Sequence, residues 1–454
     1  MNYKVYANGK AVAVRHCRIF QAPYNSVGDM EYVMLEADGK AELEIESAEE
    51  VSEVIARPLS AGVTPELRNG RIYVTVDVPS KLSIEINGSF VNNLMIFADP
   101  DRYSDFEPDE NTIVFQKGVH NADTVMIDKD GTKLYLEDGA ILNGNIRAEN
   151  CRDITICGKG MVCMEKYTYE MRKDFARSID IYQCKNVTIR DIIINDSNDW
   201  SLRINGCENV LVENVKIFGC RGNSDGVDVC GSRNVTVTDI FTRVWDDSFV
   251  VKALGTGNAE NILFKDSILW NDFARPMEVG VELRADMVTN IRFENIDVIH
   301  STTGYPIMGI HHGDHARVSD IVFDHIRVED APGAQLFDIR IADSVWNRDD
   351  AMGDIKNITF SNVSLFSAAD NRILPSNSRI EGYSAEHDIQ NVRFHNIAVN
   401  GKAVKSAEKL GLDIRNFVRD VSVTSDLEEE ALRISAEITA AEGFVLGSDG
   451  MYHG

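Results

Sequence analysis

The chain has 454 residues, of which 44% are hydrophobic, so it can bury a large core and is long enough for two or three domains. It carries 72 acidic and 46 basic residues, which give a formal net charge of −26. This charge argues against nucleic acid and anionic membranes as partners, because both are bound by basic surfaces. No apolar run reaches the roughly 18–20 residues that a membrane-crossing segment needs.

The first 95 residues predict a small β-sandwich. Alternating strands such as 4–7 and 71–76 adjoin the hairpin signals Asn8-Gly9 and Asn69-Gly70. This region (residues 1–95) lacks the repeat that follows, and a sandwich there would cover one end of a repeating domain. We expect residues 98–109 to connect the two.

The N-terminus and the cysteines favour the cytoplasm. The first residues show no basic segment followed by an apolar core, so we expect no secretory signal. Cys184 and Cys207 precede equivalent strands of the repeat, which suggests an internal ladder of thiols. We interpret all eight cysteines as small buried hydrophobic residues of a reducing compartment: Cys17, Cys151, Cys157, Cys163, Cys184, Cys207, Cys220 and Cys230.

Beyond residue 150 a short motif recurs, an Asn or Asp followed by an alternating apolar run. A motif that repeats every 23 to 37 residues is typical of a solenoid. The enrichment of the repeats in Val, Ile, Thr and Phe favours strands over helices. The sequence therefore predicts an all-β fold, a right-handed parallel β-helix over residues 98–405. The motif begins at Asp153, Asn186, Asn209, Asn234, Asn261, Asn290, Asp320, Asn357 and Asn391, at intervals of 33, 23, 25, 27, 29, 30, 37 and 34 residues.

The repeated Asn suits a tight turn before each strand, because Asn tolerates the left-handed region and can bond to its stacked counterpart. Longer intervals indicate excursions from the coil. We expect the segment 164–175 to form one, a short helix or loop beside the functional site. Residues 406–454, with a helix-like acidic segment that begins at Leu427, are the predicted C-terminal cap.

Two acidic clusters are separated by about one repeat. Asp225 lies in Asn-Ser-Asp-Gly, and the pair Asp246-Asp247 begins 21 residues later. If each repeat is one coil, these carboxylates stack on neighbouring coils, about 4.8 Å apart in the backbone. Crowded like charges cost free energy, so the arrangement suggests a purpose. Acid/base cleavage of a glycosidic bond uses one protonated and one ionised carboxyl group, and calcium binding is the rival purpose.

The motif Asn223-Ser-Asp-Gly followed by Asp-Asp resembles the active-site signature of the polygalacturonase family. It is similar also to the dextranase/isopullulanase family, which shares the β-helix and the three-aspartate site. The segments 270–280 and 297–300 resemble the dextranase pattern more closely. The Gly-His-Gly and Arg-Ile-Lys motifs, with which polygalacturonases bind the uronate carboxylate, are missing. The resemblance covers residues 85–330. The missing basic motifs and the acidic balance of the chain predict a neutral or only partly uronic oligosaccharide as substrate, rather than polygalacturonan.

The resemblance implies an inverting glycoside hydrolase in which Asp246 is the general acid, while Asp225 and Asp247 deprotonate the attacking water. A cytoplasmic enzyme would be exo-acting on short oligosaccharides. The expected sugar contacts are Asn223, Trp200, Lys252, Asp272, Arg284, His312 and Asp314.

Five basic residues near the acidic coils have two possible roles. They can hold a substrate carboxylate, or they can neutralise the aspartates. These residues are Arg221, Arg243, Lys252, Arg275 and Arg284.

The run from His311 to His315 looks metal-like, but consecutive residues of a strand point to different faces. We therefore expect neither a metal nor a cofactor. Two other function classes stay open. One is another carbohydrate reaction on a β-helix, such as that of a lyase, an epimerase or a fructosyltransferase. The other is a non-catalytic carbohydrate-binding solenoid, for which the aspartates would be dispensable.

Overall fold

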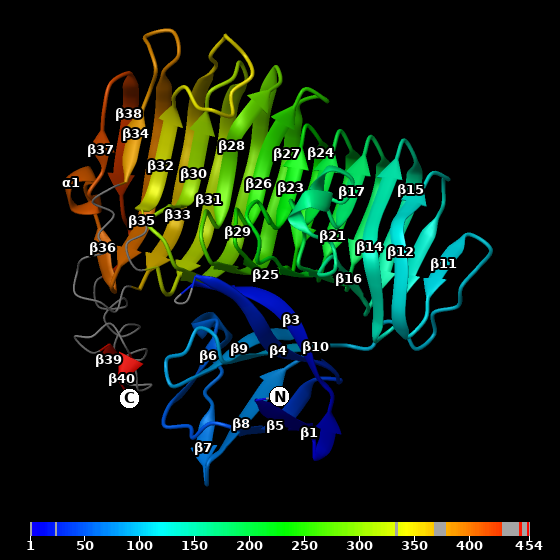
Figure 1. The fold of residues 1–454 in the computed structure, drawn as a ribbon. Helices are drawn as coiled ribbons and strands as arrows, with labels where there is room; N and C mark the ends of the chain where they lie inside the picture. Colours follow the sequence, from blue (N-terminus) through cyan, green and yellow to red (C-terminus); the bar gives the residue numbers. More distant parts are fainter. Residues whose placement is uncertain are drawn as a thin grey trace. The chain divides into compact units, whose positions relative to one another are not determined.

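A computed structural model describes residues 2–22, 25–331, 335–366, 378–428, 445–446 and 452–453. The described chain is almost entirely β-structure (Figure 1). It divides into two units, one of Met1–Pro108 with Ala436–Gly454, the other of Asp109–Ser435. None of the helices in the described residues is long and apolar enough to cross a membrane.

The N-terminal unit contains two five-stranded sheets, in the orders β2-β1-β5-β8-β7 and β3-β4-β10-β9-β6. Their inward side chains share one apolar core that includes Val5, Ile45 and Ile84. The turn Asn8-Gly9 has positive φ at both residues, as a two-residue hairpin requires. The strands are β1 (Tyr3–Ala7), β2 (Lys10–Val12), β3 (Val14–Gln21), β4 (Ser26–Glu36), β5 (Lys40–Ser47), β6 (Val54–Arg57), β7 (Glu66–Arg68), β8 (Arg71–Asp77), β9 (Ser80–Ile86) and β10 (Asn93–Asp99), with a 3₁₀ turn η2 (Leu59–Ala61).

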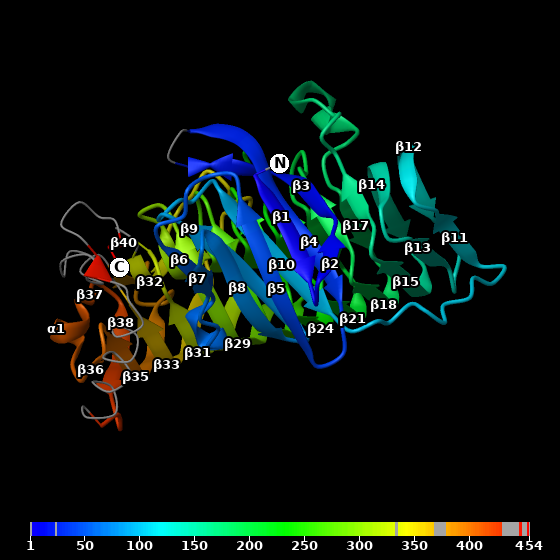
Figure 2. The same ribbon diagram turned by 90° about the horizontal axis from the view of Figure 1, so that it is seen from below.

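The second unit is a right-handed parallel β-helix, as the repeat predicted. Strands β11 to β38 form one wound sheet of 28 strands, in which strands of one coil pair in parallel with those of the next (Figures 1 and 2). The strands are β11 (Thr112–Phe115), β12 (Gly118–Ile127), β13 (Lys133–Leu136), β14 (Ala140–Glu149), β15 (Arg152–Gly158), β16 (Met161–Cys163), β17 (Ile179–Tyr182), β18 (Lys185–Arg190), β19 (Ile193–Asn195), β20 (Leu202–Asn205), β21 (Glu208–Glu213), β22 (Lys216–Phe218), β23 (Val227–Cys230), β24 (Arg233–Thr238), β25 (Phe241–Val244), β26 (Phe249–Leu254), β27 (Ala259–Asn271), β28 (Met277–Arg284), β29 (Met287–Ser301), β30 (Pro306–His312), β31 (Arg317–Val328), β32 (Gln335–Ile341), β33 (Asp354–Leu365), β34 (Arg379–Glu381), β35 (Ile389–Val399), β36 (Lys402–Val404), β37 (Asp413–Ile414) and β38 (Val418–Thr424).

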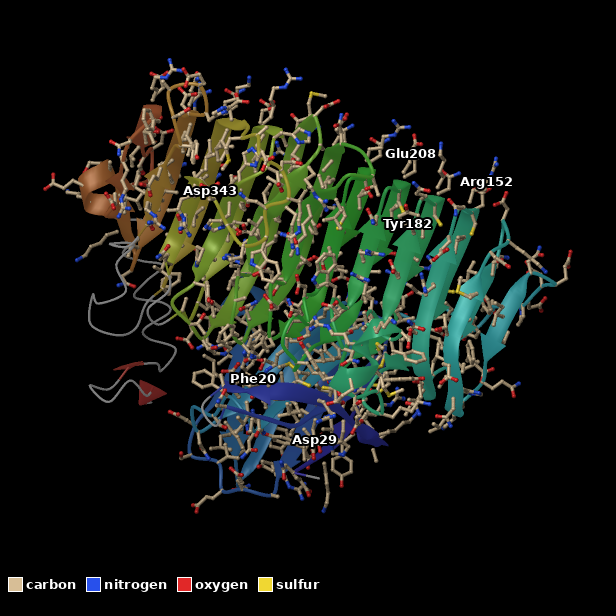
Figure 3. All side chains as sticks on the ribbon, turned by 45° about the horizontal axis from the view of Figure 1, so that its top comes forward. Phe20, Asp29, Arg152, Tyr182, Glu208 and Asp343 are labelled. Carbon is tan, nitrogen blue, oxygen red and sulfur yellow. The ribbon has the colours of Figure 1, made fainter. Side chains whose placement is uncertain are left out.

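The recurrent Asn and Asp residues form a ladder along the coils. All nine have φ between 54° and 58°, in the left-handed region. The amide of Asn234 donates to the side chain of Asn209 at 3.1 Å, and Asn261 donates to Asn234 at 3.0 Å. Each of these amides thus donates a hydrogen bond to the side-chain oxygen of its counterpart on the preceding coil. These hydrogen bonds fix the register of successive coils. Outward side chains such as Arg152 and Glu208 project from the coils near this edge (Figure 3).

A stack of phenylalanines fills the interior of the later coils. Phe264, Phe293, Phe323, Phe360 and Phe394 each lie three residues after a ladder Asn or Asp, and their successive ring centroids are 5.0, 4.7, 4.9 and 5.0 Å apart. The spacing matches the distance between neighbouring strands, so one ring per coil stacks face to face.

Parallel pairing continues past residue 405, where the sequence analysis placed the end of the solenoid. Strand β38 still pairs with β35, and a short helix α1 (Ala407–Leu410) lies between them in sequence. The acidic segment that begins at Leu427 lies mostly outside the described residues. The excursion predicted at 164–175 contains a 3₁₀ helix, η3 (Tyr169–Lys173).

Candidate active site

One sheet of the β-helix carries the acidic residues, and we call it the site sheet: β17, β20, β23, β26, β28, β30 and β32. Its inward column contains Leu202, Val227, Phe249 and Met277, all fully buried. Because side chains alternate along a strand, the neighbouring residues point outward. That outward column is polar and includes Asp180, Arg203, Asp228, Glu278 and Asp338.

The turns that precede the site sheet bring the predicted aspartates together. The residues two positions before strands β20, β23, β26 and β28 form one column along the coils. This column runs from Trp200 through Asp225 and Asp247 to Arg275. The backbone N–H of Gly226 donates to the carbonyl of Asp247 at 2.8 Å. Asp225 and Asp247 thus stack on neighbouring coils, as the spacing of the two clusters indicated.

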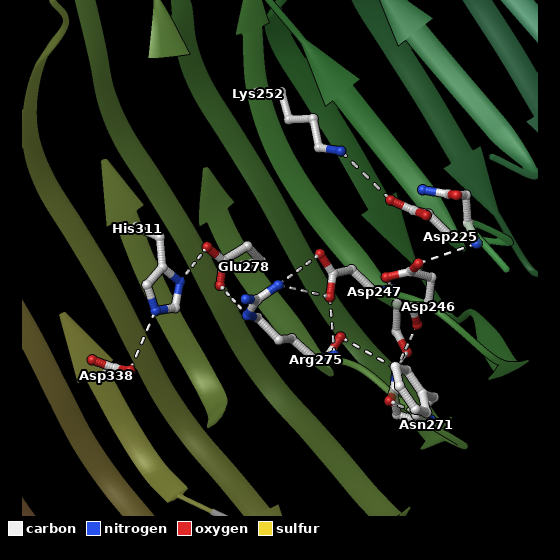
Figure 4. A network of polar contacts seen from close by, with 12 residues as sticks. Asp225, Asp246, Asp247, Lys252, Asn271, Arg275, Glu278, His311 and Asp338 are labelled. Carbon is white, nitrogen blue, oxygen red and sulfur yellow. Dashed lines mark hydrogen bonds and ion pairs between the residues drawn. The ribbon is translucent and has the colours of Figure 1, made fainter. Parts of the chain in front are cut away.

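Asp246 lies beside this column and is held by the backbone (Figure 4). Its Oδ2 accepts a hydrogen bond from the N–H of Asn223, and its Oδ1 accepts one from the N–H of Asp247, both at 3.1 Å. The carboxyl group of Asp246 is half-buried, whereas Asp225 and Asp247 are buried. Among the three aspartates, Asp246 is the one that can reach a ligand most directly.

Burial raises the pKa of all three carboxyl groups. The pKa of Asp225 lies well above its ordinary value because of burial and then the charge of Asp228. Burial also raises the pKa of Asp246, against the opposing charge of Lys252. For Asp247, burial raises the pKa to about 7, although the cation of Arg275 opposes it. A cluster of this kind retains a proton near neutral pH, which is what general acid catalysis requires.

Lys252 lies at the centre of a second, mostly buried group of carboxylates. Its Nζ is 3.4 Å from Asp228, 3.6 Å from Asp225 and 3.8 Å from Glu282, and it lies 3.9 Å from the ring centroid of Trp200. Burial would lower the pKa of Lys252, but these carboxylates outweigh burial and raise it well above its ordinary value. Lys252 therefore neutralises part of the charge of this group.

Sequence analysis missed Asp228 and Glu282, although a signal for Asp228 existed. Asp228 stands between Val227 and Val229, whose alternation places it on the outward face of the site sheet. Burial raises the pKa of Asp228 to about 6. Glu282 follows a register shift in β28, which a regular alternation does not predict.

A chain of charged residues leads away from Asp247 across the next coils (Figure 4). Nη1 of Arg275 is 3.5 Å from both carboxylate oxygens of Asp247, and its Nε is 3.5 Å from Glu278. Nδ1 of His311 is 2.7 Å from the other oxygen of Glu278, and Nε2 is 3.4 Å from Asp338. Opposite charges thus alternate from β26 to β32.

His312 and Asp314, two of the expected sugar contacts, are hydrogen-bonded within the fold. Nε2 of His312 lies 2.7 Å from the carbonyl of Ala316, and burial lowers the pKa of the imidazole to about 4. Asp314 accepts hydrogen bonds from the backbone N–H groups of Leu283, Arg348 and Asp349. His312 points away from the outward face, because His311 and not His312 occupies the outward position of β30.

Asp272 and Arg284 do not join the three aspartates either. Asp272 is buried, with Arg243 at 3.2 Å from one oxygen and the indole N–H of Trp270 at 3.0 Å from the other. It therefore anchors an internal ion pair. Within the described part of the chain, Arg284 forms no hydrogen bond or ion pair.

The excursion at 164–175 is tied to the coils beside Trp200. The amide of Asn198 donates to the carbonyls of Thr168 and Phe175, at 2.8 and 3.2 Å. Arg221, bound to Asp196 at 2.7 Å, donates to main-chain carbonyls of the same segment. The guanidinium group of Arg221 is thus held by contacts within the protein, as that of Arg243 is by Asp272.

No group of three or more His, Cys, Asp or Glu side chains that could hold a metal ion occurs among the residues that the structure covers. Fold and site together define the class of the protein. It is a β-helical solenoid whose neighbouring coils carry a cluster of carboxyl groups with pKa values raised by burial.

The comparisons with known proteins give the family. The family model for the glycosyl hydrolases family 28 matches residues 111–405. The chain belongs to this family.

Curated relatives include a polygalacturonase of Gossypium barbadense, 24% identical over 219 residues, which are 45% of this chain and 52% of the relative. Another is a polygalacturonase of Chamaecyparis obtusa, 31% identical over 93 residues, or 20% of this chain and 17% of the relative. The chain spans about half the length of the first of these relatives.

Two solved structures share the fold along most of the chain. Dex49A from Penicillium minioluteum has a TM-score of 0.62 at 15% identity and covers 93% of each chain. The family 28 exopolygalacturonase of Yersinia enterocolitica has a TM-score of 0.50 at 10% identity and covers 94% of each chain. At these identities the likeness concerns the fold alone.

Proposed function

We propose that this protein is a cytoplasmic, exo-acting glycoside hydrolase that cleaves oligosaccharides with inversion at the anomeric carbon. The observation that carries the proposal is the cluster of Asp225, Asp246 and Asp247 on neighbouring coils, with the pKa of each raised by burial. Inverting hydrolysis needs one carboxylic acid and one carboxylate with room for a water between them.

Asp246 is the proposed general acid. It is the least buried of the three aspartates, and a general acid must touch the glycosidic oxygen that it protonates. Asp225 and Asp247 together would hold the attacking water and take its proton. Since the three carboxyl groups are coupled, their titration is a property of the cluster rather than of one residue.

A neutral or only partly uronic sugar is the proposed substrate. Recognition of a uronate needs an available cation. Of the five basic residues near the acidic coils, Arg221, Arg243, Lys252 and Arg275 are paired with carboxylates of the protein, which leaves Arg284 as the one for which the described residues provide no ion pair. Arg221 binds Asp196, Lys252 lies among three carboxylates, and Arg275 is shared between two. These contacts favour the neutralising role that the sequence had left open for these basic residues.

The excursion that contains η3 supports exo action. It is anchored by Asn198 to the coil of Trp200, one coil before Asp225, where it would limit how far a glycan extends. Chain-end cleavage releases mono- or disaccharides from the first turnover, whereas internal cleavage gives a ladder of lengths.

A panel of α-glucan, galactoside and galacturonide oligomers, analysed by mass spectrometry after incubation with the protein, tests the proposal. We expect small products from a neutral or mixed oligomer. Efficient release of galacturonate from polygalacturonate would overturn the substrate class, and the absence of any hydrolysis would overturn the function. The polygalacturonases among the relatives make the galacturonide arm essential.

A further inference from the structure

Glu278 is a buried charge that the proposed mechanism does not use. It is the second residue of β28 and is fully buried, so it cannot touch a substrate. Its two oxygens have different partners. Oε1 lies 2.7 Å from Nδ1 of His311, and Oε2 lies 3.5 Å from Nε of Arg275. Any effect of Glu278 on a reaction must therefore pass through these two residues.

Gly309 makes room for the Glu278 carboxylate. The two residues pair in register on neighbouring coils, and a Cβ at Gly309 would lie 2.0 Å from Oε2 of Glu278. The backbone itself does not require glycine at this position, because φ of Gly309 is outside the left-handed region. The glycine thus serves the placement of Glu278 across the next coil.

Arg275 is divided between Glu278 and Asp247. Its Nη1 is 3.5 Å from each oxygen of Asp247, which is longer than a strong charge-assisted hydrogen bond. The charge of Arg275 lowers the pKa of Asp247, while the charge of Glu278 raises it. Burial is the largest influence on the pKa of Asp247, and the charges of Asp246 and Lys252 also act on it. The guanidinium group between Asp247 and Glu278 therefore adjusts this pKa and does not set it alone.

His311 holds Glu278 in place. The charged groups that face the imidazole are Glu278 and Arg275 on one side, and Asp338 and Arg340 on β32, with Nη2 of Arg340 at 3.1 Å from Nε2 of His311. Burial would lower the pKa of His311, but the carboxylates Glu278 and Asp338 outweigh it and raise the pKa. Nδ1–H of His311 donates to the Glu278 carboxylate, while Nε2 faces both Arg340 and Asp338.

We propose that Glu278 is a positioning residue that draws Arg275 away from Asp247, and so keeps Asp247 able to take up and release a proton during turnover. The inference rests on the proposed function of Asp247. Without the Glu278 carboxylate in its place, Arg275 would close on Asp247 and hold it ionised.

Two variants with different chemistry test the inference. Glu278→Gln removes the charge, and Gly309→Ala keeps the charge but displaces the carboxylate. In both, we expect the acidic limb of kcat/KM to move to lower pH by about one unit, a tenfold change in the acid constant. Adding Arg275→Met to Glu278→Gln should move the limb back up. Glu260→Gln, a charge-matched control on β27, should keep the wild-type profile.

The infrared band of the protonated Asp247 carboxyl group, identified by its loss in Asp247→Asn, gives a readout without substrate. We expect this band to titrate at lower pH in Glu278→Gln than in the wild type. An unchanged titration in Glu278→Gln overturns the inference, even if Gly309→Ala fails to fold. If the band shifts but the wild type hydrolyses no sugar, the proposed function fails and the positioning role of Glu278 stands.

Discussion

Asp247 costs the fold stability once it is ionised. Burial raises its pKa from 3.8 to about 7. A carboxyl group whose pKa rises on folding contributes stability below its unfolded pKa and loses it as the pH rises through the folded pKa.

We therefore expect Asp247→Asn to match the wild type in unfolding free energy near pH 4 and to exceed it by on the order of 2 kcal/mol at pH 8. The figure takes a shift of roughly three units and discounts it for coupling and for the lost Arg275 contact. Urea unfolding over a series of pH values measures the difference. A gap that does not widen with pH would contradict the assigned environment of Asp247.

The sequence predicted the aspartate cluster but misplaced several of its neighbours, and the reason is strand alternation. His311 and His312 are adjacent in β30, yet His311 alone lies on the outward face with Glu278. A single-residue uncertainty in register exchanges the two faces of a strand. The prediction that Asp225 lies next to the Asp246-Asp247 pair is less sensitive to this problem, because the two turns stack coil on coil and one member of the pair, Asp247, falls in the column of Asp225. Asp272 shows a different limit, since nothing in its motif reveals Arg243 as its buried partner.

At the scale of the coil, the recurrent Asn or Asp before each strand did most to make the β-helix predictable. The ladder Asn and Asp residues need the left-handed conformation and a stacked partner, so they recur once per coil. A second column of left-handed turn residues escaped the sequence analysis. Each member follows a ladder residue by five positions, at the end of the apolar run, so the column was present in the sequence and was overlooked: Asp191, Asn214, Asp239, Asp266, Asn295, His325, Asn362 and Asn396. The last coil also carries the motif, because Asp420-Val-Ser-Val of β38 lies in register with the Asn391 repeat and Asp420 has φ of 57°, but the sequence analysis ended the repeat at Asn391.

Phe293 tests the contribution of the interior stack. It is fully buried between Phe264 and Phe323, with centroids at 5.0 and 4.7 Å. Phe293→Ala leaves a cavity between two coils, and we expect a loss of about 3–5 kcal/mol in unfolding free energy. Phe293→Leu is the matched control and should lose less than half as much. Equal losses in the two variants would mean that the aliphatic side chain of Leu restores nothing, which would contradict the cavity as the source of the loss.

At the scale of the whole molecule, the chain has two separate apolar clusters, one in the sandwich and one in the β-helix. We expect two unfolding transitions in urea, followed by intrinsic fluorescence and circular dichroism. Ile45→Ala, in the sandwich core, should move one transition, while Phe293→Ala moves the other. A single transition shifted equally by both variants would show that the two cores unfold as one cooperative unit.

The central claim is that Asp246 protonates a leaving group while Asp225 and Asp247 activate water on the opposite face of the sugar. Proton NMR of the product during the first minutes of hydrolysis tests it most directly, on the best substrate of the oligosaccharide panel. We expect the first-formed product to have the inverted anomeric configuration, and Asp246→Asn to fold normally while its turnover falls by at least ~10²-fold. Net retention, or near-normal turnover in Asp246→Asn, would contradict the account.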